Sequence, residues 1–148
     1  MLLLILASAF ATGALLGAQP ALNAALSREL ASPFAAAIVS LIVSLLCVLP
    51  FLLFGSGTFT LATAASAPWW IWVGGVSGAV FVSMGLTVAP MIGVAFFIVV
   101  VVAGQLVSGA LIDHFGLFGM SVRTLGPSRL IGLALVFAGV LVYRFGRG

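Results

Sequence analysis

The sequence predicts an all-α integral membrane protein with five transmembrane helices. Hydrophobic residues make up 64% of the 148 positions, the mean hydropathy is +1.45, and only five basic and two acidic side chains are present. This composition lies far outside that of soluble globular domains. Hydrocarbon offers no hydrogen-bond partners, so only helices or closed barrels cross a bilayer. A transmembrane barrel has short alternating segments, whereas the apolar runs here are long and unbroken, and helices are therefore expected.

Most of the apolar runs approach the roughly 20 residues that a spanning helix requires. The predicted spans are 2–26, 34–54, 68–87, 91–112 and 130–143. The last run is short, but Tyr143 and Arg144 suit the membrane interface. The segment 55–67 is small and uncharged and is expected to be a loop. We expect residues 1–148 to form a single five-helix domain.

Local signals mark the ends of these runs. The polar residues 27–29 mark an exit into water, and Pro33 suits the first turn of the second helix. Pro68 is followed closely by all three tryptophans, which are typical of the membrane interface. The break at 88–90 is very short, which predicts an antiparallel hairpin of the third and fourth helices. Residues 113–116 close the fourth helix.

Glycines at helical spacing predict close packing between helices. Small residues four apart let a neighbouring helix approach, and glycines seven apart share one helix face. The candidate packing or dimer residues are Gly13, Gly17, Gly74, Gly78, Gly132 and Gly139.

Polar side chains inside the apolar runs are the candidate site residues, because such groups are costly in a membrane. Gln19 and Asn23 are four apart, hence on one helix face, and Ser108 follows Gln105 by three residues. These groups can contact a polar substrate, or they can hydrogen-bond between helices, which is worth about 0.6–2 kcal/mol. The candidate substrate-binding residues are Gln19, Asn23, Gln105, Ser108 and Asp113.

Asp113 is the only acidic residue near the end of a predicted span, and His114 follows it. One interpretation is a group at the mouth of a pathway that responds to protons or cations. The other is a solvated helix end at which Asp113 pairs with Arg123 or Arg129. We favour the second, because Asp113 lies at a membrane boundary.

The arginines are spread almost evenly over the two sides of the predicted bundle. Arg123 and Arg129 lie on the side of the N-terminus, and Arg28, Arg144 and Arg147 lie on the other. The Lys/Arg bias of short loops sets orientation, so this near balance favours insertion both ways up. Two oppositely inserted copies can pair as a ten-helix inverted repeat. The alternative is one orientation, with the side of Arg28 in the cytoplasm.

The depths of the two glutamines fit such a pair. Gln19 lies about 10 Å inside the end of the first run, and Gln105 lies about 10 Å inside the end of the fourth. These ends are on opposite sides of the membrane. In an inverted pair, Gln19 of one copy is therefore level with Gln105 of the other. We expect these amides to line a shared pathway.

Three stretches resemble the YdcZ-type family of bacterial inner-membrane proteins, in the drug/metabolite transporter superfamily. They are 13–26 (G-x3-G-A-Q-x3-N-x2-L), 68–79 (P-W-W-x-W-x-G-G-x2-G-A) and 104–116 (G-Q-x7-D-H-F-G). The resemblance implies five helices, antiparallel dimerisation and a transport function. The spacing of Gly132 and Gly139 is also similar to the dimerising last helix of small multidrug resistance proteins. The first helix has no membrane-embedded glutamate, however, which argues against proton-coupled export of lipophilic cations.

The function expected is therefore a small secondary transporter, exporting a small polar or amphiphilic solute as an antiparallel homodimer or a heterodimer with a paralogue. A passive channel on the same dimer and a non-transporting assembly subunit are the alternatives. No enzyme activity, cofactor or metal site is expected, because no nucleophile–base set, ligand cluster or phosphate loop is present. Five scattered arginines form no nucleic-acid patch, and Cys47 has no disulfide partner.

Overall fold

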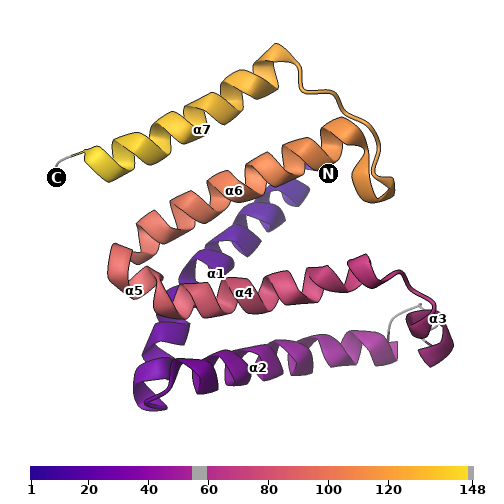
Figure 1. Cartoon of the computed structure of the whole chain (residues 1–148), viewed down its shortest axis with the longest axis vertical. Coiled ribbons are helices and arrows are strands. Elements are labelled where there is room, and N and C mark those ends of the chain that lie inside the picture. Colours follow the sequence, from indigo (N-terminus) through magenta and orange to yellow (C-terminus); the bar gives the residue numbers. More distant parts are fainter. Residues whose placement is uncertain (55–59, 147–148) are drawn as a thin grey trace. The chain divides into compact units, whose positions relative to one another are not determined.

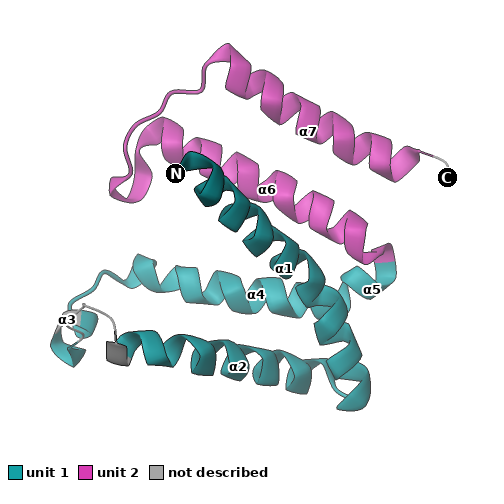
Figure 2. Ribbon diagram, turned by 180° about the vertical axis from the view of Figure 1, so that it is seen from behind, with its two compact units in different colours: residues 1–91 teal, residues 92–148 magenta. Residues whose placement is uncertain are grey.

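The computed structural model describes residues 1–54 and 60–146, and its regular structure there is helical (Figure 1). The chain divides into two compact units, Met1–Met91 and Ile92–Gly148 (Figure 2). Within the described ranges, five helices are long and apolar enough to cross a membrane. The predicted all-α fold with five spans is thereby confirmed, whereas the single five-helix domain stays a prediction.

The first unit is built on three long helices. Helices α1, α2 and α4 pack against one another in all three pairwise combinations. The helices of this unit are α1 (Leu2–Glu29), α2 (Pro33–Phe54), α3 (Leu61–Ala65), the 3-10 helix η1 (Trp69–Trp72) and α4 (Val73–Thr87), followed by α5 (Ala89–Ile92).

The core of the first unit lies where these three helices meet. Ala36 and Ala37 of α2 are buried against Val82 and Leu86 of α4, with Leu26 of α1 packed beside them. The two alanines are small, so the neighbouring backbones can approach closely. Most other large apolar side chains are exposed, which fits a surface that faces lipid.

The turn between α1 and α2 is closed by local hydrogen bonds. The backbone N–H of Leu30 donates to the Leu26 carbonyl oxygen at 2.9 Å, and Ala31 takes a left-handed φ of 50°. The Ser32 hydroxyl oxygen then accepts the Ala35 N–H at 3.2 Å, with Pro33 at the first helical position. This serine cap and proline start are the usual beginning of a helix.

The second unit is an antiparallel pair of helices, α6 (Val94–Phe115) and α7 (Pro127–Phe145), with the 3-10 helix η2 (Leu117–Gly119) between them. Near the start of α6, the rings of Phe96 and Tyr143 stack at 6.0 Å. At the opposite end, the loop after η2 folds back on the end of α6.

The observed helix bounds differ modestly from the predicted spans. Helix α1 continues from 26 to Glu29, and α7 begins at Pro127 instead of 130. Polar and charged residues can stay helical once the chain has left the hydrocarbon, which explains both extensions. Helix α6 covers Val94–Phe115 in place of 91–112, because Gly93, with a φ of 90°, separates it from α5.

The loop predicted before the third span and the start of that span differ from the observed structure. The expected loop 55–67 contains the short helix α3. Residues 55–59 of this loop lie outside the described residues. Arg147, one of the arginines compared between the two sides of the membrane, also lies outside them. The Trp69–Trp72 segment forms a 3-10 turn before α4 rather than part of one α-helix. The hairpin of the third and fourth spans stays a prediction, since α4 and α6 belong to different units.

The glycines expected to mediate packing have open space beside them. A Cβ atom added at any of them would meet nothing within 4 Å among the atoms that the structure describes. None of them is therefore required for a close approach within its own unit, and their role in packing stays a prediction. The residues are Gly13, Gly17, Gly74, Gly78, Gly132 and Gly139.

Replacing Gly116 with alanine should destabilise the second unit by about 1–3 kcal/mol, because a left-handed φ is costly for other residues. Gly116 ends α6 with φ 61°, and an added Cβ would lie 2.7 Å from Val122 Cγ2. Thermal unfolding in detergent, followed by circular dichroism, measures the loss. The control is Gly104→Ala in the middle of α6, where the space is open. Equal stability of the two variants would contradict this account of the turn.

Candidate functional site

The polar residues of α1 lie in a groove of the first unit. This first groove has a volume of about 510 Å³ and runs between α1 and α2. Gln19 and Asn23 both line it, in agreement with their spacing of four residues. The lining residues are Thr12, Leu15, Leu16, Gln19, Leu22, Asn23, Leu26, Val39, Ser40, Val43 and Ser44.

Asn23 is the most buried polar side chain of the first groove, with 7% of its surface exposed. Its amide has no hydrogen-bond partner in the part of the chain that the structure describes. Every fully buried side-chain nitrogen or oxygen of those residues has a hydrogen-bond partner. The Asn23 amide atoms, which have no partner, are therefore not fully buried, and Asn23 lines the groove. Asn23 therefore presents unused donors and an unused acceptor to this space.

The hydroxyl groups of the groove are partly used by their own helices. Thr12 Oγ1 donates to the Ser8 carbonyl oxygen at 2.9 Å, and Ser44 Oγ donates to the Ser40 carbonyl oxygen at 3.0 Å. Their remaining lone pairs can accept a hydrogen bond from a ligand. Thr12, Ser40 and Ser44 were not singled out from the sequence. The four-residue spacing of Ser40 and Ser44 is the signal that could have indicated them.

Pro20 removes one hydrogen bond from the backbone of α1 near these side chains. It is fully buried within the continuous helix α1. Proline has no N–H, so the carbonyl oxygen of Leu16 lacks the donor that position 20 supplies in an ordinary helix. Leu16 lines the first groove. The groove therefore combines amide groups with an irregularity in the helix backbone.

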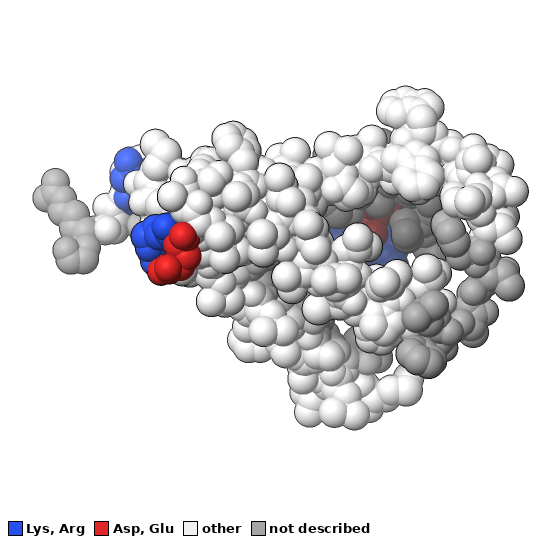
Figure 3. All heavy atoms as spheres, turned by 90° about the horizontal axis from the view of Figure 1, so that it is seen from below, with Lys and Arg blue, Asp and Glu red and all other residues white. Residues whose placement is uncertain are grey.

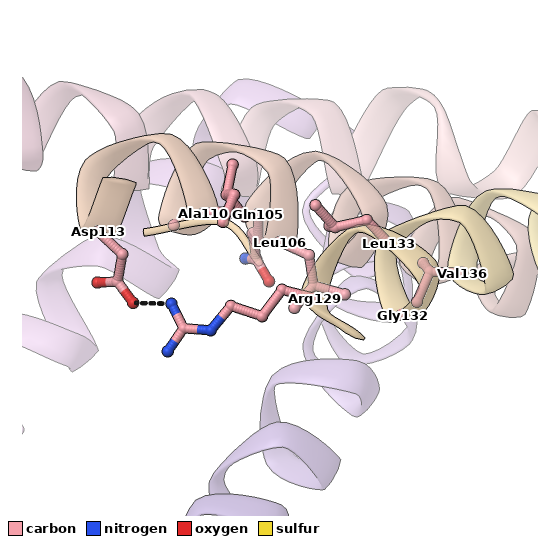
Figure 4. Close-up of a pocket in the computed structure, with 10 residues that line it drawn as sticks. Gln105, Leu106, Ala110, Asp113, Arg129, Gly132, Leu133 and Val136 are labelled. Carbon is pink, nitrogen blue, oxygen red and sulfur yellow. Dashed lines mark ion pairs between the residues drawn. The ribbon is translucent and has the colours of Figure 1, made fainter. Parts of the chain in front are cut away.

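A second groove, of about 450 Å³, lies within the second unit between α6 and α7 (Figure 4). Gln105 and Asp113 of α6 lie along it, and Arg129 of α7 faces Asp113. Ser108, three residues after Gln105 on α6, is exposed and does not line the groove. The lining residues are Gln105, Leu106, Gly109, Ala110, Asp113, Leu125, Arg129, Gly132, Leu133 and Val136.

Asp113 forms an ion pair with Arg129 at one end of this groove. Asp113 Oδ2 lies 3.8 Å from Arg129 Nη1, and each side chain is 43% exposed. An exposed pair of this kind contributes only about 0–1 kcal/mol. Arg129 Nη1 also donates to the Arg123 carbonyl oxygen at 3.0 Å, which fixes the guanidinium group. Of the two expected partners, Arg129 is the one that the structure places against the Asp113 carboxylate.

His114 holds the loop that leads to α7. Its Nδ1 atom accepts the backbone N–H of Leu125 at 3.1 Å, so the imidazole must be unprotonated at Nδ1. The backbone N–H of Arg123 also donates to the Asp113 carbonyl oxygen, at 2.7 Å. Both contacts attach the loop to the last turn of α6. The structure thus gives His114 a positioning role beside the ion pair.

Charged side chains are sparse on the molecular surface, and Figure 3 shows them in small clusters on an otherwise uncharged face. Across 1–54 and 60–146, no group of three His, Cys, Asp or Glu side chains could hold a metal ion. The chemistry available in the grooves is therefore hydrogen bonding, with one ion pair at the end of the second groove.

A protein-family model described as "Putative inner membrane exporter, YdcZ" matches residues 4–142. The match covers all five of the spanning helices, although it leaves out the ends of α1 and α7. No curated protein and no solved structure shows a significant match to the chain.

Replacing His114 with glutamine should release the loop before α7, whereas asparagine should largely retain it. The Oδ1 atom of asparagine can occupy the place of Nδ1, while the longer glutamine places its oxygen elsewhere. Loss of one neutral hydrogen bond is worth about 0.5–1.5 kcal/mol, or a two- to tenfold faster exchange of the Leu125 amide. Hydrogen–deuterium exchange at Leu125 measures this effect. Equal exchange in both variants would show that His114 does not hold the loop.

Proposed function

The chain belongs to the YdcZ inner-membrane exporter family, and on this premise we propose that it is a small secondary transporter. It is a multi-pass protein of the inner membrane, in a family of transporters rather than enzymes. The proposed activity is export of a small polar or amphiphilic solute by alternating access. The single observation that carries it is the unpartnered Asn23 amide in the first groove.

This amide supports transport because an amide in a membrane-spanning helix is costly to keep without a hydrogen-bond partner. Its atoms are not fully buried, so a molecule in the groove can supply that partner. Polar groups kept at such a cost in membrane helices are usually part of a substrate or ion pathway. Pro20 lies three residues before Asn23, and irregular helices often frame transporter sites.

The proposed working unit is an antiparallel dimer, as the balance of arginines suggests. In the observed helices, Gln19 lies about 15 Å before Glu29, the end of α1, and Gln105 lies about 15 Å before Phe115, the end of α6. Both helices extend three residues beyond the predicted ends, so the two depths stay equal. An inverted pair would bring the first groove of one copy level with the second groove of the other. Both grooves could then serve one pathway.

The alternating-access step follows from this pairing. Inverted repeats exchange conformations, so that a central site opens first to one side and then to the other. The amide-lined first groove would hold the polar part of the solute. The Asp113–Arg129 pair, half exposed at the end of α6, would lie toward a mouth of the pathway. The partner chain can be an identical copy or a paralogue.

A passive channel on the same dimer is the second candidate. The observation that favours it is that the first groove is lined, within the described ranges, by residues without ionisable side chains, since coupling to protons usually needs an embedded carboxylate. Flux without a coupling gradient would identify a channel. A non-transporting assembly subunit would instead tolerate leucine at both Gln19 and Gln105 without loss of its role.

Cross-linking tests the proposed pairing. One chain carries Gln19→Cys and the other Gln105→Cys, both with Cys47→Ala and with different tags. We expect a cross-linked product that contains both tags, because equal depth brings the two positions together. Leu4→Cys replaces Gln19→Cys as the control, since Leu4 lies about 22 Å farther along α1. Absence of the mixed product, or an equal yield with Leu4→Cys, would contradict the pairing.

A further inference from the structure

None of the described residues that line the first groove is ionisable. The nearest charged residues of α1 are Arg28 and Glu29, about 7–9 Å beyond Asn23 along the helix. A charged ligand group that enters this groove loses its hydration without gaining an opposite charge. Removing a charged group from water costs far more free energy than removing a neutral polar group. The chemistry of this groove therefore disfavours both cations and anions.

The groups that remain unused can bind a neutral polar group. Gln19 and Asn23 offer amide donors and acceptors without partners in the described chain, and the Ser44 hydroxyl keeps its lone pairs after donating to Ser40. A hydroxyl or carboxamide both donates and accepts, so it complements this mixed set. The volume of about 510 Å³ is within the range of small-molecule sites.

We infer that the first groove binds an uncharged hydroxyl or carboxamide group of the transported solute, with Asn23 as its principal contact. This inference rests on the proposed function and narrows its substrate class. The apolar lining, which includes Leu15, Leu22 and Val43, takes the adjoining hydrocarbon part. The complete ligand is then a neutral amphiphile, distinct from a lipophilic cation.

The burial of Asn23 argues for a ligand in this place. Asn23 is only 7% exposed and lines the groove, so the groove is where a ligand can reach it. A neutral ligand in the groove would supply the hydrogen bonds that this amide lacks within the described chain. Water alone or a polar group of a second copy could also meet this amide, and the experiment below distinguishes both.

Asn23 is the only asparagine of the chain, which gives a site-specific signal. The full chain in lipid nanodiscs, labelled with ¹⁵N at the asparagine side chain, shows one amide group by nuclear magnetic resonance. The probes are hexanamide, hexylammonium and hexanoate, which share a short alkyl chain and differ in charge. We expect saturable movement of the Asn23 signals with hexanamide, and roughly tenfold weaker binding, equivalent to about 1.4 kcal/mol, for both ions.

Variants provide the controls for this titration. In Asn23→Leu the signal of the Gln19 side chain reports on the groove, and hexanamide binding should weaken roughly tenfold. Ser77→Ala in α4, outside both grooves, should leave binding unchanged. The titration of the unaltered chain stands even if Asn23→Leu fails to fold.

Three results would overturn the inference. If none of the probes changes the chemical shifts of the Asn23 amide, water is the only occupant of the groove. Equal movement with hexylammonium or hexanoate would reject a neutral ligand. If the Asn23 chemical shifts change with the number of protein copies per nanodisc and not with hexanamide, a second copy of the chain occupies the groove.

Failure of this inference is separable from failure of the proposed function. The titration reports on Asn23 without any transport, whereas the cross-linking reports on pairing without any ligand. Selective hexanamide binding with no mixed cross-link would keep the neutral site and reject the inverted pair. The mixed cross-link without hexanamide binding would keep the pair and reject the neutral site.

Discussion

Hydrocarbon cannot replace water as a hydrogen-bond partner, and the rest of this structure depends on that constraint. It requires the spanning backbone to be helical, and it makes every polar side chain inside a span costly. Thr12 and Ser44 meet the constraint by donating to carbonyl oxygens of their own helices. The Asn23 amide has no hydrogen-bond partner within the described chain, and Asn23 lines the first groove. The position of this unpartnered amide therefore indicates the candidate site.

The two grooves differ in chemistry because they lie at different places along their helices. The first groove is lined by neutral groups and extends past the buried Pro20 of α1. The second groove reaches the end of α6, where Asp113 and Arg129 can be partly hydrated. A pathway made from one groove of each kind would offer a charged mouth and a neutral interior. That order suits a solute which enters from water and is then held in a dry space.

Sequence patterns were sufficient for the helices and for the shared face of Gln19 and Asn23. Long apolar runs specify spans, and a spacing of four residues specifies a face, so both follow from local rules. Helix ends were less accurate, because Arg28 and Glu29 stay helical after leaving the apolar run. The short helix α3 was missed, since five residues carry too little pattern.

Contacts that depend on loop folding were beyond local patterns. The hydrogen bond from Leu125 to His114 joins residues eleven apart through a turn at Gly116. Charge complementarity limited the partner of Asp113 to two arginines, but only the position of α7 selects Arg129. Ser40 was overlooked although Ser44 lies four residues later on the same helix face. That spacing does not show that the face lies opposite Gln19 and Asn23, which depends on how α1 and α2 pack.

The central claim is that the polar face of the first groove is open to polar molecules while the nearby helix surface faces lipid. Ser40 lines this groove, whereas Ile42 of the same helix does not line it and is 50% exposed. Cysteine at each position, with Cys47→Ala, can be tested with a water-soluble methanethiosulfonate, which reacts with the thiolate form. The account predicts much faster labelling at position 40 than at position 42. Equally slow labelling at both positions would contradict it.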